Sequence, residues 1–260
     1  MNVLSSRVAL RDRTLLDVLD LSLRFLASHK TAFTKMSACV SVPAFFVSWL
    51  AALTFGWWLG WVTAIVLASF AEAPFVALAS RLVFQPTVPT REALGAGLSA
   101  IPRLFGLRVL QASGILAGAI FLVLPGFWVA TLFVFATEVT VLERASVTAS
   151  VSRMQRLVSG YFGDVLMAML LFWVLCLLAV AIGSAAGSAF LEGLLQIRMR
   201  RSEDQMGGPL ALFGMWLALP FLTTARFFVY LNLRTRREGW DIQTRFAAIA
   251  ARAAKDGAAT

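Results

Sequence analysis

Residues 125–160 read PGFWVATLFVFATEVTVLERASVTASVSRMQRLVSG. The apolar run from Phe127 to Leu142 contains a single carboxylate, Glu138. After this run, the spacing of the residues gives a helix with two faces. Val147, Val151, Met154 and Leu157 form the apolar face, and the polar face opposite has Ser152, Arg153, Gln155 and Arg156. The order predicts a membrane span that is followed by an amphipathic helix on the membrane surface.

The composition of the whole chain also indicates a protein that is surrounded mostly by lipid. Of 260 residues, 59% are hydrophobic, and the mean hydropathy is +0.79, whereas soluble domains are about 45–50% apolar. Charged residues make up 14% of the chain, and the net charge is +9. Because the arginines flank apolar runs, we expect them to meet anionic lipid headgroups, and we do not expect nucleic acid as a partner.

Apolar runs long enough to cross a bilayer recur along the chain. We expect spans at about residues 33–54, 57–78, 104–124, 127–142, 161–195 and 209–229. The fifth run is too long for one perpendicular helix, so it is either tilted and protruding or broken at Gly183–Gly187. The predicted fold is an all-α polytopic helix bundle of six transmembrane helices in a single membrane domain.

Amphipathic surface helices are expected beside these spans, over residues 14–28, 90–98 and 146–159. Thr14 followed by Asp17 is typical of a capping box. Pro102 should end or kink the second surface helix, and Leu124-Pro125-Gly126 should form a sharp hairpin turn. A surface helix plus a hairpin would then recur in three units, 14–80, 90–144 and 146–233, before a tail, 234–260.

The distribution of Lys and Arg predicts the orientation. With six spans and both termini cytoplasmic, every Lys and Arg lies on the cytoplasmic side except Arg198, Arg200 and Arg201. We therefore expect a multi-pass protein of the cell (inner) membrane. If the loop with those arginines is cytoplasmic, five or seven spans is the alternative. The first residues, MNVLSSRVALRDR, lack the apolar core of a signal peptide, so the first span would serve as an uncleaved signal.

No catalytic set is found in the sequence. The single histidine, His29, excludes an HExxH zinc protease, and Cys39 and Cys176 lie inside spans without metal or disulfide spacing. We therefore expect neither an enzyme nor a cofactor or metal. Two pairs of glycines, each four positions apart, predict helix-packing faces: Gly114 with Gly118, and Gly183 with Gly187.

Two carboxylates inside spans are the best candidates for function. Glu72 lies nearly two turns deep and has Pro74 beside it, whereas Glu138 lies about one turn from the end of its span, where a side chain can snorkel to water. The alternative for both is a structural carboxylate with a charged partner.

The basic residues near the surface form a second candidate set. Arg153 and Arg156 lie on the surface helix, and Arg234, Arg236 and Arg237 follow the last span. We expect these arginines to contact anionic lipid or a partner protein. Beyond them, one more surface helix is predicted with Ile242, Phe246, Ile249 and Ala253 on one face.

Three stretches resemble a known family: Arg13–Asp20 with Phe25, Val139–Phe162, and Tyr230–Ile242. They are similar to bacterial integral membrane proteins grouped with the membrane domain of glycerophosphoryl diester phosphodiesterase and to uncharacterised YciC-type proteins. The resemblance implies a six-helix membrane protein. It implies no hydrolase activity, because the phosphodiesterase chemistry belongs to a separate soluble domain. Asn232 stands where the family usually has Asp, so that position supplies no fixed negative charge here.

Two functions follow as expectations. The first is a non-enzymatic scaffold or partner subunit that binds anionic lipid or another membrane protein through its surface helices. The second is a transporter or permease-like subunit for a lipid or small solute, which would dock on a cytoplasmic ATPase. A cavity that reaches Glu72 would favour transport, whereas solid packing around Glu72 would count against it. A membrane enzyme is the third alternative.

Overall fold

The computed structural model describes residues 14–121, 123–193, 196 and 208–238, and every regular element within them is a helix. In chain order the helices are α1 (Leu15–Ser28), α2 (Lys30–Phe55), α3 (Trp57–Leu82), α4 (Thr90–Phe121), α5 (Val123–Leu132), α6 (Ala136–Glu143), α7 (Val147–Ser159), α8 (Phe162–Gly193) and α9 (Pro209–Glu238). The predicted all-α class is confirmed.

Six stretches of the described helices are long and apolar enough to cross a membrane. They are Lys30–Phe55, Trp57–Leu82, Thr90–Ile120, Leu124–Glu143, Phe162–Gly193 and Pro209–Arg237. The fourth consists of α5 and α6 together. The predicted multi-pass architecture agrees with these stretches in number and order.

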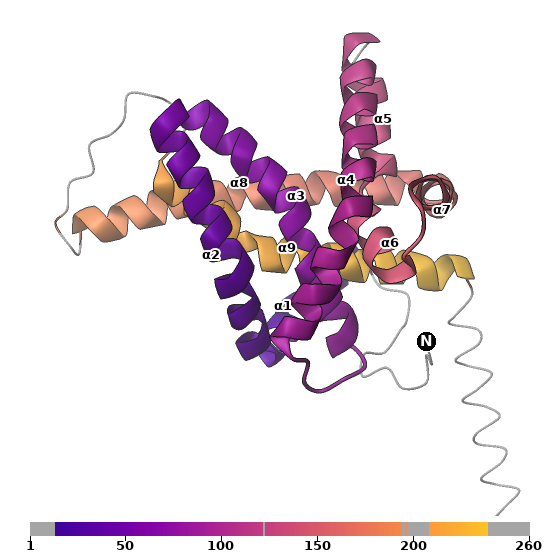
Figure 1. The fold of residues 1–260 in the computed structure, drawn as a ribbon, viewed down its shortest axis with the longest axis horizontal. Coiled ribbons are helices and arrows are strands. Elements are labelled where there is room, and N and C mark those ends of the chain that lie inside the picture. The colour runs from indigo at the N-terminus through magenta and orange to yellow at the C-terminus, as the bar shows by residue number, and fades with distance from the viewer. Residues whose placement is uncertain (1–13, 122, 194–195, 197–207, 239–260) are drawn as a thin grey trace, which may run out of the picture.

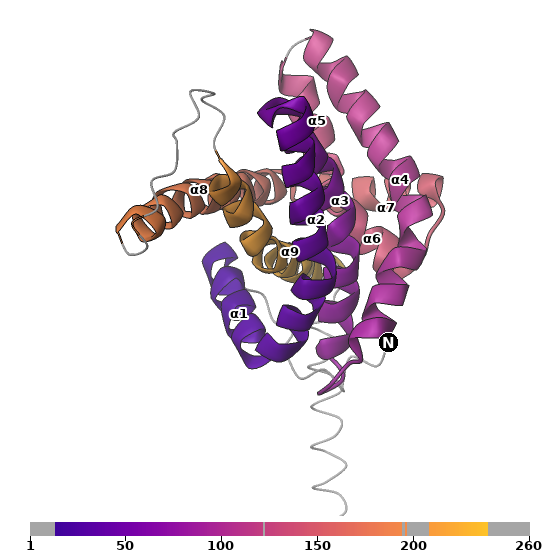
Figure 2. The same ribbon diagram turned by 60° about the vertical axis from the view of Figure 1, so that its left-hand side comes forward.

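The membrane helices form three hairpins, α2–α3, α4–α5 and α8–α9 (Figure 1). The α4–α5 hairpin and the α8–α9 hairpin point in widely different directions, and the view turned by 60° shows the same divergence (Figure 2). The hairpins meet at one end of the molecule, away from their turns (Figure 1). We call this end the base; it comprises the start of α2, the end of α3, the start of α4, the end of α6, the start of α8 and the end of α9.

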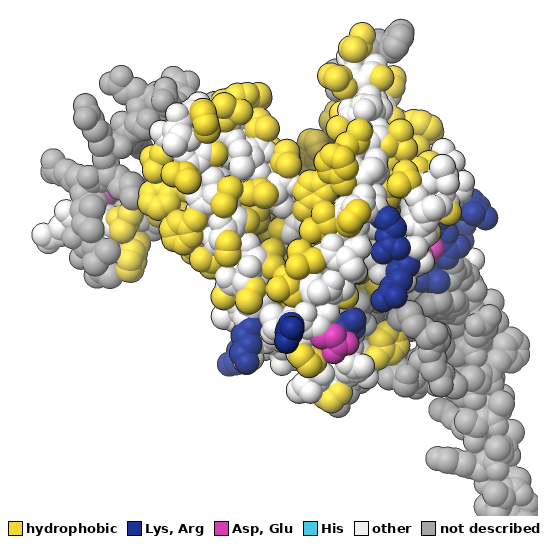
Figure 3. Space-filling view, in the orientation of Figure 1, with side chains coloured by type: hydrophobic (Ala, Val, Ile, Leu, Met, Phe, Trp, Pro, Cys, Tyr) yellow, Lys and Arg dark blue, Asp and Glu magenta, His cyan; other side chains and the backbone are white. Residues whose placement is uncertain are grey.

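The surface separates into two kinds. Lys and Arg side chains gather along the base, whereas apolar side chains cover the hairpins (Figure 3). Large apolar residues on the hairpins are more than half exposed, among them Leu53, Ile65, Leu116, Ile120, Leu177 and Ile182. So much exposed apolar area suits contact with lipid, since soluble monomers rarely expose large contiguous apolar patches.

Helix α1 begins with the predicted capping box. The Thr14 hydroxyl accepts a hydrogen bond from the Asp17 backbone N–H, and the Asp17 carboxylate accepts one from the Thr14 N–H, both at 3.2 Å. Val18 and Phe25 are buried against the bundle, whereas Leu16 and Leu23 on another face are 73% and 56% exposed. α1 therefore packs one face against the bundle and exposes further apolar side chains on another face.

The expectation that Pro102 ends a separate surface helix over residues 90–98 is wrong. α4 runs unbroken from Thr90 to Phe121, and Pro102 lies inside it. The buried residues Ala100, Leu104 and Leu107 lie on both sides of the proline. Packing on both sides keeps the helix continuous and offsets the backbone hydrogen bond that a proline removes.

The turn between α4 and α5 also differs from the prediction. Pro125 and Gly126 lie within the first turn of α5, not in a loop, where proline is tolerated because the first N–H groups have no helical acceptor. The glycines bring the helices together: a Cβ on Gly118 would lie 2.6 Å from the Gly126 nitrogen, and one on Gly114 would lie 3.0 Å from Val129 Cγ1.

The fifth span is one continuous helix of 32 residues. It is about 48 Å long, against a hydrocarbon core of about 30 Å. Of the two alternatives, the break at Gly183–Gly187 is therefore wrong. These glycines face α9: a Cβ on Gly183 would lie 2.7 Å from Gly214 Cα, and one on Gly187 would lie 3.0 Å from Leu210 Cδ2.

Several predictions lie outside the described residues. They concern the first 13 residues, the loop with Arg198, Arg200 and Arg201, and the predicted tail helix with Ile242, Phe246, Ile249 and Ala253. The division into three repeating units and the single domain stay predictions.

The close approach of α8 and α9 gives a stability prediction. Gly183→Ala puts a methyl group against the α9 backbone, so we expect the melting temperature of the detergent-purified protein to fall by several degrees, about 3–10 °C for an overpacking cost of about 1–3 kcal/mol. Gly95→Ala is the matched control, because a Cβ at Gly95 meets nothing within 4 Å. An unchanged melting temperature for Gly183→Ala would contradict the packing described.

Candidate functional site

Four charged side chains from four helices meet near the base: Glu72 of α3, Arg108 of α4, Glu138 of α6 and Arg226 of α9. Arg226 lies at the centre of this group, which we call the intramembrane ion cluster. Its Nη1 and Nη2 donate to the two carboxylate oxygens of Glu72 at 2.8 and 2.7 Å, and its Nε donates to Glu138 Oε1 at 2.7 Å. One guanidinium thus joins three helices.

Arg108 completes the ion cluster from the other side of Glu72. Its Nη2 donates to Glu72 Oε2 at 2.9 Å and to the Thr137 hydroxyl at 3.0 Å, and its Nη1 donates to Gln111 at 2.7 Å. The Thr137 hydroxyl in turn donates to Glu72 Oε2 at 3.0 Å. The Glu72 carboxylate therefore accepts from two arginines and a threonine.

The cluster is almost fully withdrawn from the surface. Glu138 is 0% exposed, and the side chains of Arg226, Glu72 and Arg108 are 13%, 15% and 18% exposed. Two positive and two negative groups cancel formally, which lowers the cost of placing charge in an apolar medium. The expectation that Glu138 snorkels to water is wrong, because its carboxylate binds Arg226 inside the bundle.

A helix break positions Glu138. The span predicted as continuous over 127–142 is interrupted at Phe133–Phe135, between α5 and α6. Glu138 lies in the first turn of α6, where the positive end of the helix dipole stabilises a carboxylate. The same turn of α6 supplies Thr137 to the cluster.

A cavity of about 340 Å³ reaches the ion cluster. Glu72, Arg108 and Arg226 line it, together with apolar side chains that include Ile65, Val134, Met169, Phe172, Trp173, Met215, Leu219 and Leu222. Ile65 and Trp173 are also 62% and 54% exposed on the molecular surface. The cavity therefore borders the apolar outer surface of the helices at these two side chains.

A second polar group lies at the base, around Glu143 at the end of α6. Glu143 Oε1 accepts from the Tyr230 hydroxyl at 2.7 Å and from Arg153 Nε at 3.1 Å, and Arg234 Nη1 lies 3.9 Å away. Tyr230 itself is 0% exposed. These contacts hold α7 and α9 against α6.

The structure divides the arginines that the sequence groups as surface contacts. Arg153 and Arg234 turn toward Glu143, and Arg236 lies 3.5 Å from Asp164 of α8. Arg156 and Arg237 are exposed. α7 buries Met154, Leu157 and Val158 in the bundle, so its apolar face packs on protein.

Sequence reasoning missed Arg108, Arg226 and Tyr230. The signal for the two arginines was present, since each lies within a predicted apolar span as a charge that needs a partner. The expectation that they lie on the cytoplasmic side with the other Lys and Arg residues is wrong, because both are paired and nearly buried inside the bundle. Nothing in the sequence showed that Arg226 would reach Glu72, 154 positions away. Among the described residues, no group of three or more His, Cys, Asp or Glu side chains is placed to hold a metal ion.

The central role of Arg226 is testable through stability. Arg226→Met leaves Glu72 and Glu138 buried without their main cation, which should lower the free energy of unfolding by about 3–5 kcal/mol. Thermal unfolding in mild detergent would measure it. Arg24→Met is the control, because the Arg24 side chain is 79% exposed in its pair with Asp20. A variant as stable as the wild type would show that the pairs contribute little.

Comparison with known protein families, with curated proteins and with solved structures finds no match for this chain. Membership of the family related to the phosphodiesterase membrane domain stays a prediction from the sequence motifs.

Proposed function

We propose that the protein is a carrier or permease-like subunit that binds an amphiphilic, lipid-like molecule with one anionic group in the cavity beside the ion cluster. The observation that carries this proposal is a cavity that is charged at one end, apolar along its walls and bordered by the apolar outer surface of the helices. An amphiphile has the same division, with a polar group at one end and an apolar chain along the rest.

The charges that line the cavity favour an anion. Arg108 and Arg226 line it against the single carboxylate of Glu72, whereas Glu138 does not line it. The cavity wall thus carries two positive charges and one negative charge. In addition, the Nε atom of Arg108 is buried without a hydrogen-bond acceptor. A phosphate or carboxylate would offer further acceptors to the guanidinium groups that line the cavity.

The helix architecture beside the cavity supports movement of the ligand. Val134, which lines the cavity, lies in the break between α5 and α6. Pro74 and Pro220 interrupt backbone hydrogen bonding in α3 and α9 near the ion cluster. Discontinuous helices around a site are typical of transporters, because they let hairpins tilt about a fixed site.

A scaffold role is the second candidate, and α7 supplies the observation that favours it. α7 packs its apolar residues inward and presents Thr148, Ser152, Gln155 and Arg156 outward at the base. Such a fixed polar face suits a protein partner, for example a cytoplasmic ATPase. In this proposal the base faces the cytoplasm of the inner membrane, because Lys and Arg gather there. We propose no enzymatic activity.

Cys176 provides a direct test, because its thiol lines the cavity, whereas Cys39 lies exposed on α2. We expect dodecyl phosphate to slow the modification of Cys176 by a small methanethiosulfonate several-fold. Dodecyltrimethylammonium, which has the same chain and the opposite charge, should protect much less. The rate at Cys39 is the control and should not change with either amphiphile. Equal protection by both would exclude an anion-selective cavity.

Arg108→Gln separates charge recognition from apolar binding. Because this change removes one of the two cations that line the cavity, we expect the preference for dodecyl phosphate over the cation to fall about tenfold. In proteoliposomes, the wild type should speed the movement of a fluorescent phosphate-bearing lipid between leaflets, and Arg108→Gln should slow it. If the protein binds the lipid but does not speed its movement, the carrier proposal is wrong, and a receptor or scaffold role fits instead.

A further inference from the structure

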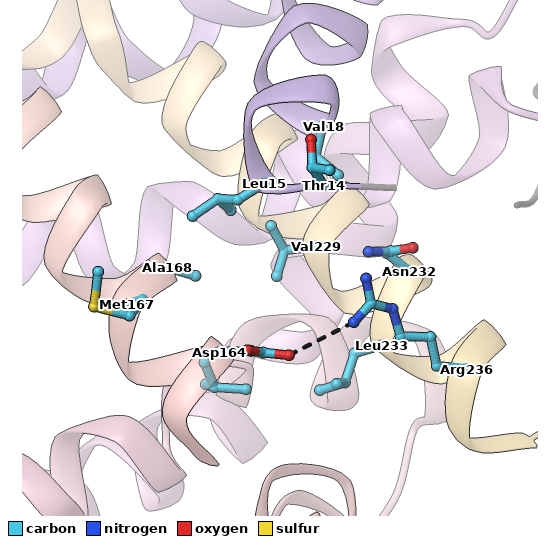
Figure 4. A pocket seen from close by; sticks show the side chains of 11 residues that line it. Thr14, Leu15, Val18, Asp164, Met167, Ala168, Val229, Asn232, Leu233 and Arg236 are labelled. Carbon is cyan, nitrogen blue, oxygen red and sulfur yellow. Dashed lines mark ion pairs between the residues drawn. The ribbon is translucent and has the colours of Figure 1, made fainter. Parts of the chain in front are cut away.

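A second cavity, separate from the ion cluster, lies at the base between the start of α1, the start of α8 and the end of α9 (Figure 4). Its volume is about 270 Å³. Asp164, Asn232 and Arg236 supply polar groups, and Met167, Ala168 and Val229 supply part of the apolar wall. We call it the base groove. It combines both signs of charge with apolar surface in one small space.

The ion pair in the base groove is loose. Arg236 Nη1 and Asp164 Oδ2 are 3.5 Å apart (Figure 4), and the Asp164 side chain is 70% exposed. The pairs of the ion cluster are shorter, at 2.7–2.9 Å, and nearly buried. A separation of 3.5 Å is longer than a charge-assisted hydrogen bond. The Asp164 carboxylate therefore has room to accept hydrogen bonds from a bound cationic group.

An apolar path leads away from the groove along α8. Met167 lines the groove and is also 63% exposed. Leu170 and Val174 continue the exposed apolar surface along α8, at 37% and 51%. A ligand with its polar end at Asp164 can thus place an apolar chain along α8, from Met167 toward Val174.

The groove includes Arg236, near the end of α9, where Arg234 and Arg237 also lie. The capping box at Thr14, which lines the groove, fixes the start of α1 at its edge. In a membrane protein this is the level of lipid headgroups, because cationic side chains and helix ends are found there.

We propose that the base groove binds a zwitterionic aminophospholipid of the ethanolamine class. Its primary ammonium group donates to Asp164, its phosphate accepts from Arg236 and the Asn232 amide, and an acyl chain follows α8. One positive and one negative protein charge match one phosphate and one ammonium group. A choline headgroup fits less well, because a quaternary ammonium group has no N–H to donate.

Native mass spectrometry of the full-length protein in mild detergent tests the proposal. Phosphatidylethanolamine, phosphatidylglycerol and phosphatidylcholine with identical acyl chains are offered at equal concentration. The wild type should retain phosphatidylethanolamine best. Asp164→Asn should reduce its retention about three- to fivefold, to the level of phosphatidylcholine, and Asp164→Glu should restore it. Arg236→Gln should weaken all three lipids.

Asp20→Asn and Arg24→Gln are the matched controls, because this exposed pair on α1 lies outside the groove. Both controls should retain lipid as the wild type does. Equal retention of the three lipids, or full retention of phosphatidylethanolamine by Asp164→Asn, would overturn the proposal. So would displacement of the lipid by an equal concentration of soluble phosphoethanolamine, because the acyl chain would then contribute nothing. None of these outcomes bears on the protection of Cys176, which reports on the other cavity.

Discussion

Arg226 binds Glu72 through two nitrogens and Glu138 through the third, and this contact joins α3, α6 and α9. Ion pairs inside an apolar bundle contribute little net stability, since desolvation offsets most of the attraction, but removing one partner is costly. The pairs therefore act mainly as a constraint on geometry. Only an arrangement that brings all three helices to Arg226 gives both carboxylates this cation as a partner. Arg108 extends that constraint to α4 through Glu72.

The same constraint explains why a cavity persists where the hairpins separate. The charges join α3, α4 and α9 at the ion cluster, whereas the hairpins diverge away from the base (Figures 1 and 2). The space between α3, α8 and α9 is then lined by apolar side chains, with guanidinium groups at its inner end. A polar end and an apolar wall follow from one set of contacts, and they define what the cavity can hold.

The sequence predicted the helices better than their ends and partners. Hydropathy alone located the spans, and Thr14 and Asp17 predicted the start of α1, because both signals are local. Pro102 and Gly183 misled, since tertiary packing keeps α4 and α8 continuous through residues that locally disfavour a helix. Glu72 and Glu138 were recognised as candidates. Their partner Arg226 was not, because pairing over such sequence distances depends on how hairpins pack.

Helix α6 has a carboxylate near each end, and each binds a different part of the molecule. Glu138 holds Arg226 inside the bundle, and Glu143 binds Arg153 of α7 and Tyr230 of α9 at the base. α6 has only eight residues, so its two ends cannot move independently. A sideways shift of α7 would therefore act on Glu143 and, through this one short helix, on the contact between Glu138 and Arg226. α6 thus connects the base of the protein to the buried ion cluster.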